Sequence, residues 1–289
     1  MDEERIKYKL KLASAFISEG KNLHAIQIYK NLIDVTKRED IYYMLAELYE
    51  DMKFIDSGEK ILLELIEQND NSTEINMYLG QYLLRNAKWI DAIEVLNSLE
   101  DQIYSSNFLI GYSYLMLNEF ELSKDYFKKY INSDEKSELK QEANIYLAKI
   151  EYELNNFDSA LNYAKSAQFV YSDFWELNLI LAKVYYSLDM NTHAVTPIEK
   201  ALKLTPKEIG VLEFAGKIYF KLEDFKQAEQ YFSECIEHSS NISAEIYTLL
   251  AKSFVKQKKY NEAQLFFTLA LQIDPEYQPA IAGQANLNK

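Results

Sequence analysis

The sequence has little of what interrupts a helix. Its 289 residues include only seven glycines and four prolines, and all four prolines lie beyond residue 190. Glycine and proline destabilise a helix interior most, because glycine is conformationally free in the unfolded chain and proline lacks a backbone donor. Their scarcity, beside abundant Leu, Ile, Ala, Lys and Glu, predicts an all-α fold with helix over nearly the whole chain.

Cysteine and long apolar runs are also scarce. Cys235 is the single cysteine, which excludes an internal disulfide framework and is typical of a reducing compartment. The sequence contains no run of about 18 apolar residues that could cross a bilayer as a helix. Residues 1–5 do not resemble the start of a secretory signal peptide. We therefore expect a cytoplasmic protein with no direct membrane insertion.

The sequence also lacks an excess of basic residues. The chain has 31 Lys and Arg against 45 Asp and Glu, a formal net charge of −14, and both of its halves are acidic. A nucleic acid backbone is negatively charged and attracts a basic protein surface. We therefore expect no nucleic acid partner, and an RNA-binding helical array is the least favoured function.

The usual signatures of catalysis are missing as well. The sequence has no glycine-rich phosphate loop, no nucleophile elbow and no paired His-Glu zinc motif. Its three histidines, His24, His193 and His238, have no cysteine partners at metal-ligand spacing. We expect no catalytic residue, no metal site and no cofactor, and hence a protein that is not an enzyme.

The chain does contain a repeat of about 34 residues. Two small residues, twelve positions apart, recur in every unit and are followed by large apolar residues at helical spacing. The pairs are Ala13 and Ala25, Ala46 and Gly58, Gly80 and Ala92, Gly111 and Ser123, Ala148 and Ala160, Ala182 and Ala194, Gly216 and Ala228, and Ala251 and Ala263. Each unit therefore predicts two antiparallel helices that approach closely where the small residues cross.

This spacing resembles the tetratricopeptide repeat (TPR). The last unit matches best, with Tyr247, Leu250, Ala251, Phe254, Ala263, Phe267, Ala270 and Pro275 where the family expects them. The resemblance implies a right-handed superhelical solenoid of antiparallel helix pairs. It places hairpins at approximately 6–38, 39–72, 73–103, 104–140, 141–174, 175–208, 209–243 and 244–277, with a C-terminal capping helix at 278–289.

The resemblance also implies a site. In this family the first helix of each repeat lines a concave groove, and its second, fifth, ninth and twelfth positions point inward. Carried over to this chain, those columns are apolar in the early repeats and hold one lysine per repeat later, with aromatic rings nearby. The candidate partner-binding residues are Tyr43, Met77, Phe108, Tyr112, Lys149, Tyr152, Lys183, Tyr186, Lys217, Phe220 and Lys252. We expect a protein or peptide partner with apolar anchors and acidic groups.

Two features of these columns have alternative interpretations. The lysines could instead form surface ion pairs with Glu142, Glu176 or Glu245, although such pairs contribute little stability. Four successive repeats carry an asparagine where the family has an aromatic residue: Asn76, Asn107, Asn144 and Asn178. These amides could bind a ligand backbone, but hydrogen bonds between adjacent helices are the favoured interpretation.

A non-catalytic scaffold or adaptor is the function that these observations favour. Two alternatives remain open: a structural protein that assembles end to end through its terminal repeats, and a regulatory or peptide-sensing subunit of a larger complex. The abundance of Lys, Asn, Ile and Tyr is typical of an AT-rich genome, and we expect a bacterial source.

Overall fold

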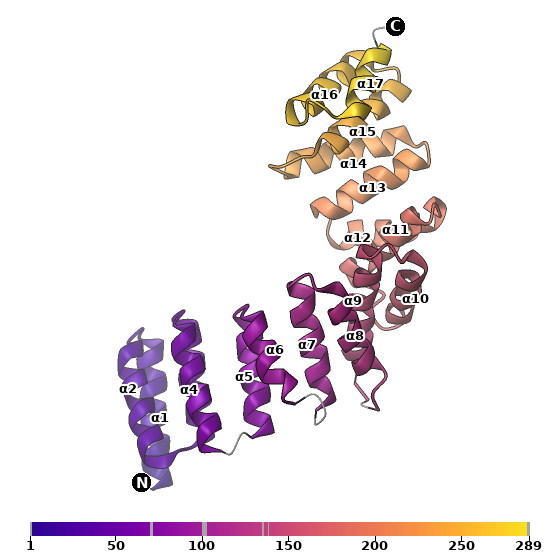
Figure 1. The fold of residues 1–289 in the computed structure, drawn as a ribbon. Helices are drawn as coiled ribbons and strands as arrows, with labels where there is room; N and C mark the ends of the chain where they lie inside the picture. The colour runs from indigo at the N-terminus through magenta and orange to yellow at the C-terminus, as the bar shows by residue number, and fades with distance from the viewer. Residues whose placement is uncertain (1, 70–71, 100–102, 135, 138, 288–289) are drawn as a thin grey trace. The chain divides into compact units, whose positions relative to one another are not determined.

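The computed structural model describes residues 2–69, 72–99, 103–134, 136–137 and 139–287. Within these ranges the chain forms seventeen α-helices and no strand. Residue contacts divide it into two compact units, Met1–Lys136 and Ser137–Lys289. Each unit is a stack of antiparallel helix pairs in which every pair packs on the next (Figure 1).

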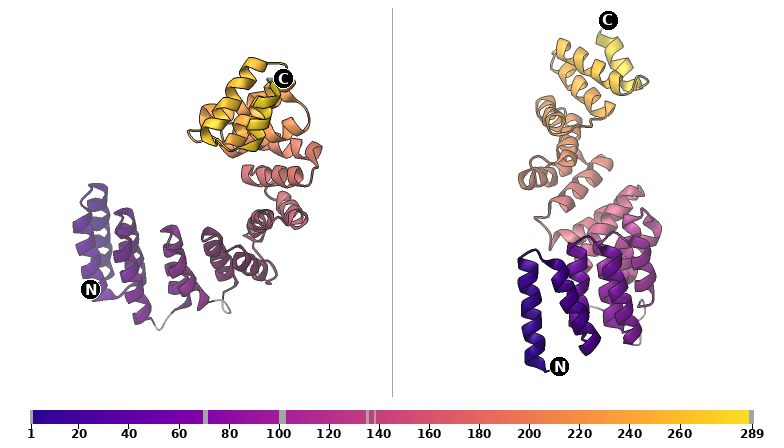
Figure 2. Two further views of the ribbon diagram at one scale, coloured as in Figure 1. Left: turned by 45° about the horizontal axis from the view of Figure 1, so that its top comes forward. Right: turned by 90° about the vertical axis from the view of Figure 1, so that its left-hand side faces the viewer.

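The described residues of the first unit form four helix pairs, and the two further views in Figure 2 show the same stacking. The pairs are α1 (Glu3–Ser18) with α2 (Asn22–Thr36), α3 (Glu39–Asp51) with α4 (Ile55–Gln68), α5 (Thr73–Arg85) with α6 (Trp89–Asn97), and α7 (Tyr104–Met116) with α8 (Phe120–Ile131).

The second unit contains four pairs and a last single helix. The pairs are α9 (Leu139–Glu153) with α10 (Phe157–Gln168), α11 (Trp175–Ser187) with α12 (Asn191–Leu204), α13 (Ile209–Lys221) with α14 (Phe225–His238), and α15 (Ala244–Lys256) with α16 (Tyr260–Ile273). Helix α17 (Gln278–Leu287) packs on α16 and α15.

The sixteen small residues of the repeat lie where the two helices of a pair cross, and all sixteen are buried. At Gly216 a Cβ would overlap the Phe232 ring, and at Gly80 it would overlap Leu96. In the fourth pair the Ser123 hydroxyl donates a 2.7 Å hydrogen bond to the Gly111 carbonyl across the crossing. Close backbone approach therefore explains why these positions are restricted to Ala, Gly and Ser.

The turn inside each pair has the same backbone geometry in all eight repeats. Five positions before the second small residue, one residue adopts a left-handed conformation with φ between 56° and 72°. The eight residues are Gly20, Lys53, Ala87, Asn118, Asn155, Asp189, Glu223 and Lys258. The next residue donates its N–H to the carbonyl five positions back, as Lys88 does to Leu83 at 2.9 Å. This is the Schellman end of the first helix, and it reverses the chain into the second.

Candidate partner-binding surface

The lysine row consists of Lys149, Lys183, Lys217 and Lys252, and all four residues belong to the second unit. They lie on α9, α11, α13 and α15, the first helices of four successive pairs. Lys149 is exposed and the other three are partly buried. In the second unit the repeat thus places one lysine on the first helix of each pair, at the same position of the repeat.

Lys183 sits on aromatic surface without a carboxylate partner. Its ammonium lies 4.9 Å from the centre of the Phe214 ring and 5.9 Å from that of Tyr152. No ion pair of Lys183 occurs among the described residues. Burial lowers the pKa of Lys183 and the positive charges of Lys149 and Lys217 add to this, while the charges of Glu153 and Glu213 oppose it. The site thus holds a partly desolvated cation that forms no direct ion pair among the described residues, although the charges of Glu153 and Glu213 favour its protonated form.

Lys217 is in the opposite situation. Its ammonium forms ion pairs with Glu213 at 2.7 Å and with Glu245 at 3.0 Å, and its side chain is only 11% exposed. Burial alone would lower the pKa of Lys217, but the hydrogen bonds to both carboxylates raise it above the ordinary value. The ion-pair interpretation therefore holds for Lys217 and Glu245. In the described part of the chain it does not extend to Lys149, Lys183 or Lys252.

Phe214 contacts both Lys183 and Lys217, and it is not among the site residues predicted from the sequence. The Phe214 ring lies 4.9 Å from the Lys183 ammonium and 5.2 Å from that of Lys217. It also packs edge to face with the Tyr186 ring, with the ring centres 6.0 Å apart and an angle of 88° between the ring planes. Phe214 precedes Lys217 by three residues, so the two share a helix face, and this spacing could have identified it.

The remaining rings of the lysine region are also in aromatic contacts. Tyr152 lies 5.7 Å from Phe157, and Phe220 meets Phe225 edge to face at 5.5 Å. Tyr186 carries the Lys221 ammonium 6.0 Å from its ring centre. These contacts hold the rings in place while leaving each of the three predicted residues partly exposed.

The four apolar candidates lie in the first unit, on α3, α5 and α7. Tyr43 packs on Tyr78 with ring centres 4.2 Å apart, and Tyr112 meets Trp89 edge to face at 6.0 Å. Tyr43, Met77 and Tyr112 are partly buried, which leaves surface available to a partner. Phe108 differs, because it is only 7% exposed.

Phe108 belongs to the core of its helix pair. Its ring packs on Phe127 at 5.6 Å and on Tyr130 at 5.5 Å, both from α8. The side chain turns toward the second helix because the neighbouring Gly111 and Ser123 let the two helices approach. Phe108 therefore offers a partner almost no surface.

The asparagine column makes local hydrogen bonds. The Asn76 amide donates to the Ser72 carbonyl at 3.0 Å, and the Asn178 amide donates to the carbonyls of Ser172 and Phe174 at 2.9 and 2.8 Å. These acceptors belong to the segment that leads into the helix carrying each asparagine. The expected bonds between adjacent helices are thus replaced, at Asn76 and Asn178, by bonds that stabilise the start of the same helix.

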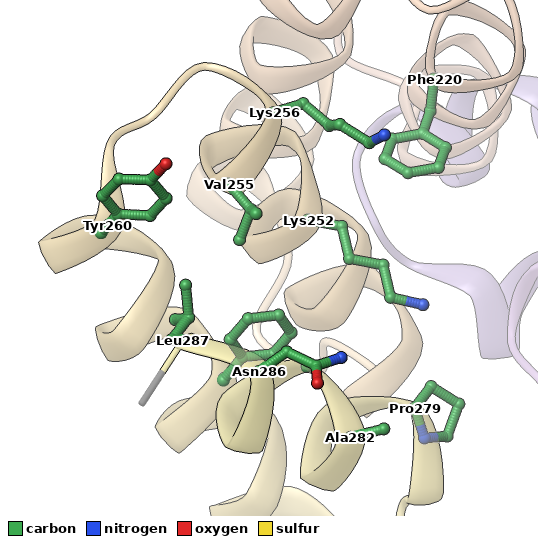
Figure 3. Close-up of a pocket in the computed structure, with 11 residues that line it drawn as sticks. Phe220, Lys252, Val255, Lys256, Tyr260, Pro279, Ala282, Asn286 and Leu287 are labelled. Atoms are coloured by element: carbon green, nitrogen blue, oxygen red, sulfur yellow. The ribbon is translucent and has the colours of Figure 1, made fainter. Parts of the chain in front are cut away.

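A cavity of about 730 Å³ adjoins the last lysine of the row, and we call it the α17 pocket (Figure 3). Its lining includes Phe220 of α13, Lys252, Val255 and Lys256 of α15, Phe267 of α16, and Leu287 of α17. Two of these residues, Phe220 and Lys252, are among the predicted site residues. The fit of α17 against α15 and α16 therefore adds a hollow that the repeat pattern does not predict.

The groups most often used in metal binding and covalent chemistry are dispersed or buried. Across the described ranges, no three or more His, Cys, Asp or Glu side chains cluster as they would around a metal ion. Cys235 is 1% exposed, and burial, with the nearby charge of Glu213, raises the pKa of its thiol to about 11. Among the helices that the structure describes, none is long and apolar enough to cross a membrane.

A family model described as tetratricopeptide repeat matches residues 104–137, 210–241 and 244–277. These segments hold the pairs α7/α8, α13/α14 and α15/α16, and each contains a stacked ring pair between its two helices. The pairs are Tyr114–Tyr126 at 5.6 Å, Tyr219–Tyr231 at 5.5 Å and Phe254–Phe266 at 5.5 Å. A comparison with curated proteins finds no match.

Solved structures similar to this chain include several with helical repeats. One is the APC/C hetero-tetramer Cut9–Hcn1, with a TM-score of 0.61 and 15% identity, covering 95% of this chain and 55% of that one. Pseudomonas aeruginosa pilF has a TM-score of 0.61 and 16% identity, covering 74% and 96%. The C-terminal part of a TPR repeat-containing protein from Cytophaga hutchinsonii has a TM-score of 0.54 and 17% identity, covering 72% and 98%.

This chain thus spans 55% of the length of the first of these structures. At identities this low, each likeness is one of fold.

Proposed function

Because this chain is a tetratricopeptide repeat protein, we propose that it is a non-catalytic scaffold or adaptor that binds an acidic segment of another protein along its lysine row. TPR proteins generally mediate protein–protein interactions, and one similar structure is a hetero-tetramer of Cut9 and Hcn1. The fold itself does not select a partner, so the chemistry of the partner has to come from the site.

The observation that carries the proposal is the environment of Lys183. A cation removed from water costs free energy unless an opposite charge or a ring face compensates for it. The rings of Phe214 and Tyr152 and the charges of Glu153 and Glu213 compensate in part, but burial still lowers the pKa of Lys183, and Lys149 and Lys217 add positive charge. A carboxylate of a partner placed beside Lys183 would add the direct ion pair that Lys183 lacks, and the exposed parts of the nearby rings would accept apolar groups.

The lysine row also contrasts with the rest of the chain. In a protein of formal net charge −14, an acidic partner is repelled from most of the surface. A local row of cations on four successive first helices therefore directs an acidic segment to one face of the second unit. As part of the same proposal we place the protein in the cytoplasm of a bacterium, on the basis of its single cysteine and its composition.

Affinity capture with charge-matched variants tests the proposal. The bait Lys149→Gln/Lys183→Gln loses two charges of the row, and the control Lys200→Gln/Lys203→Gln loses two exposed charges of α12 in the same unit. We expect a protein that wild type and control retain and the row variant loses, with all three baits showing the same helical circular dichroism.

A retained protein is then expressed and its affinity for each bait measured directly. Equal affinity for the row variant and the control would contradict the proposal. Capture of a second copy of this chain by all three baits, with association in sedimentation at several concentrations, would favour end-to-end assembly instead.

A further inference from the structure

The α17 pocket has the size and lining of a site for an apolar group. Its volume of about 730 Å³ lies within the range of ligand-binding cavities in proteins. Phe220, Val255, Phe267 and Leu287 give it aromatic and aliphatic walls. Replacing the water in such a cavity by an apolar side chain is favourable, because it removes apolar surface from water.

The charge at this pocket is of one sign. Lys252 and Lys256, both on α15, line it, and no Asp or Glu is present among the described lining residues. Neither lysine forms an ion pair in the part of the chain that the structure describes. The chain as a whole carries 45 acidic against 31 basic residues, so a purely cationic lining departs from its average. An apolar ligand with a negative charge next to it complements this lining.

Helix α17 forms one wall of the pocket, and the packing of α17 fixes that wall in place. Ala280 is fully buried, and Gly283 lies so close to Phe267 that a Cβ there would overlap the ring. Ala282, next to Gly283, lines the pocket and is exposed. Helix α17 therefore presents a shaped surface beside Lys252 of the lysine row.

We propose that the α17 pocket receives a large apolar side chain of the partner segment, and that Lys252 and Lys256 bind acidic side chains next to it. The pocket adjoins the row through Lys252, which belongs to both, so the same segment can occupy them together. This inference rests on the proposed function and adds to it the composition of one end of the segment.

Synthetic peptides test this inference directly. The probe is a fluorescein-labelled, amidated peptide in which Phe, Leu or Ile precedes two aspartates within a Gly-Ser sequence. Matched peptides replace either the apolar residue by Ser or both aspartates by Lys. We expect the apolar–acidic peptides to bind the full chain in fluorescence anisotropy, and each replacement to weaken binding at least about tenfold.

Two variants and their controls locate the binding. Ala282→Trp fills the pocket from an exposed position of α17, and Ala285→Trp adds the same side chain at an exposed position of α17 that does not line the pocket. Lys252→Gln/Lys256→Gln removes the two cations, with Lys200→Gln/Lys203→Gln as its charge control. We expect the Ala282→Trp and Lys252→Gln/Lys256→Gln variants to lose at least about tenfold in affinity and both controls to match wild type.

Three results would overturn the inference. The first is that no apolar–acidic peptide binds wild type. The second is that the peptides bind Ala282→Trp and Ala285→Trp equally. The third is that dodecanoate binds wild type but not Ala282→Trp while no peptide binds, which would indicate a fatty-acid site instead. The proposed function is tested separately. Partner capture that depends on Lys149 and Lys183 but is unaffected by Ala282→Trp would support binding along the lysine row and contradict binding in the α17 pocket.

Discussion

The ammonium of Lys183 lies 4.9 Å from the centre of the Phe214 ring, and no carboxylate forms an ion pair with it in the described residues. By contrast, the Lys217 ammonium lies 5.2 Å from the centre of the same ring and forms ion pairs with Glu213 and Glu245. Two lysines of one row therefore share a ring and differ in charge compensation. Of these two lysines, Lys183 is therefore the one without a carboxylate already in contact.

Binding of an acidic segment should weaken at high pH because Lys183 loses its proton early. Burial lowers its pKa below the ordinary lysine value of 10.5, so the ammonium is neutralised at a lower pH than an exposed lysine. Only the charged form attracts a carboxylate, so affinity falls as the pH rises toward 10.5. Titration of the captured partner, whose binding depends on Lys149 and Lys183, against wild type over this pH range measures the effect. The variant Lys183→Arg, whose guanidinium stays charged, should keep its affinity over the same pH range. A parallel decline in both proteins would show that Lys183 is not the group responsible.

Removing the Phe214 ring should weaken binding without unfolding the protein. Phe214→Leu keeps an apolar side chain but loses the cation–π contacts to Lys183 and Lys217, each worth about 0.5–1 kcal/mol at such sites. Only the contact with Lys183 affects the partner, so we expect a loss of roughly two- to fivefold in affinity for the captured partner. Phe214→Tyr retains the ring and should bind as wild type does. An equal loss for Leu and Tyr would indicate a packing role alone.

Filling a helix crossing should destabilise the second unit. Gly216→Leu places a side chain against Phe232 where even a Cβ would overlap, and overpacking of this kind costs about 1–3 kcal/mol. Gly210→Ala on the same helix is the control, since the nearest atom to its Cβ is 3.8 Å away. Alanine is favoured over glycine in a helix by up to about 1 kcal/mol, so the control should be neutral or stabilising. Urea denaturation followed by circular dichroism measures both, and a stable Gly216→Leu variant would contradict the close crossing.

Glycine should stabilise the turn at Lys53. This residue has φ of 63°, a left-handed conformation that costs a side-chain-bearing residue about 1–2 kcal/mol, of which the added chain entropy of glycine cancels part. We expect Lys53→Gly to raise the free energy of unfolding by up to about 1 kcal/mol. Lys60→Gly, an exposed position in α4 of the same pair, should lower it by about 1 kcal/mol. Thermal unfolding distinguishes them, and a shift in the same direction for both would be inconsistent with the turn geometry.

Cys235 should react with thiol reagents only when the repeat opens. Its side chain is 1% exposed and burial raises the pKa of the thiol to about 11, so little thiolate is present near neutral pH. We expect negligible labelling by iodoacetamide in buffer and complete labelling in denaturant, measured by mass spectrometry. Rapid labelling of the folded protein would mean that α14 opens locally on the time scale of the reaction.

The repeat and its helices could be predicted from the sequence, because small residues at a constant spacing dictate where two helices approach and the turns between them follow a common geometry. Ala251 and Ala263 are buried at the crossing that their spacing predicts. The contacts of the candidate surface residues could be predicted from the sequence only in part. Repeat position alone indicated that Lys183 and Tyr152 share a region, and the distance of 5.9 Å between the ammonium and the ring is consistent with it.

Other outcomes depended on which side chains meet across helices, and no periodicity contains that information. Phe108 occupies a groove column in sequence but packs on Phe127 and Tyr130. Lys217 and Lys183 occupy equivalent positions, yet only Lys217 lies within reach of two carboxylates. The sequence by itself thus determined the helix pairs and the place of each residue within its repeat. Only the tertiary structure decided which cation is compensated, which ring is buried and where α17 leaves a cavity, because these depend on distances between residues that are far apart along the chain.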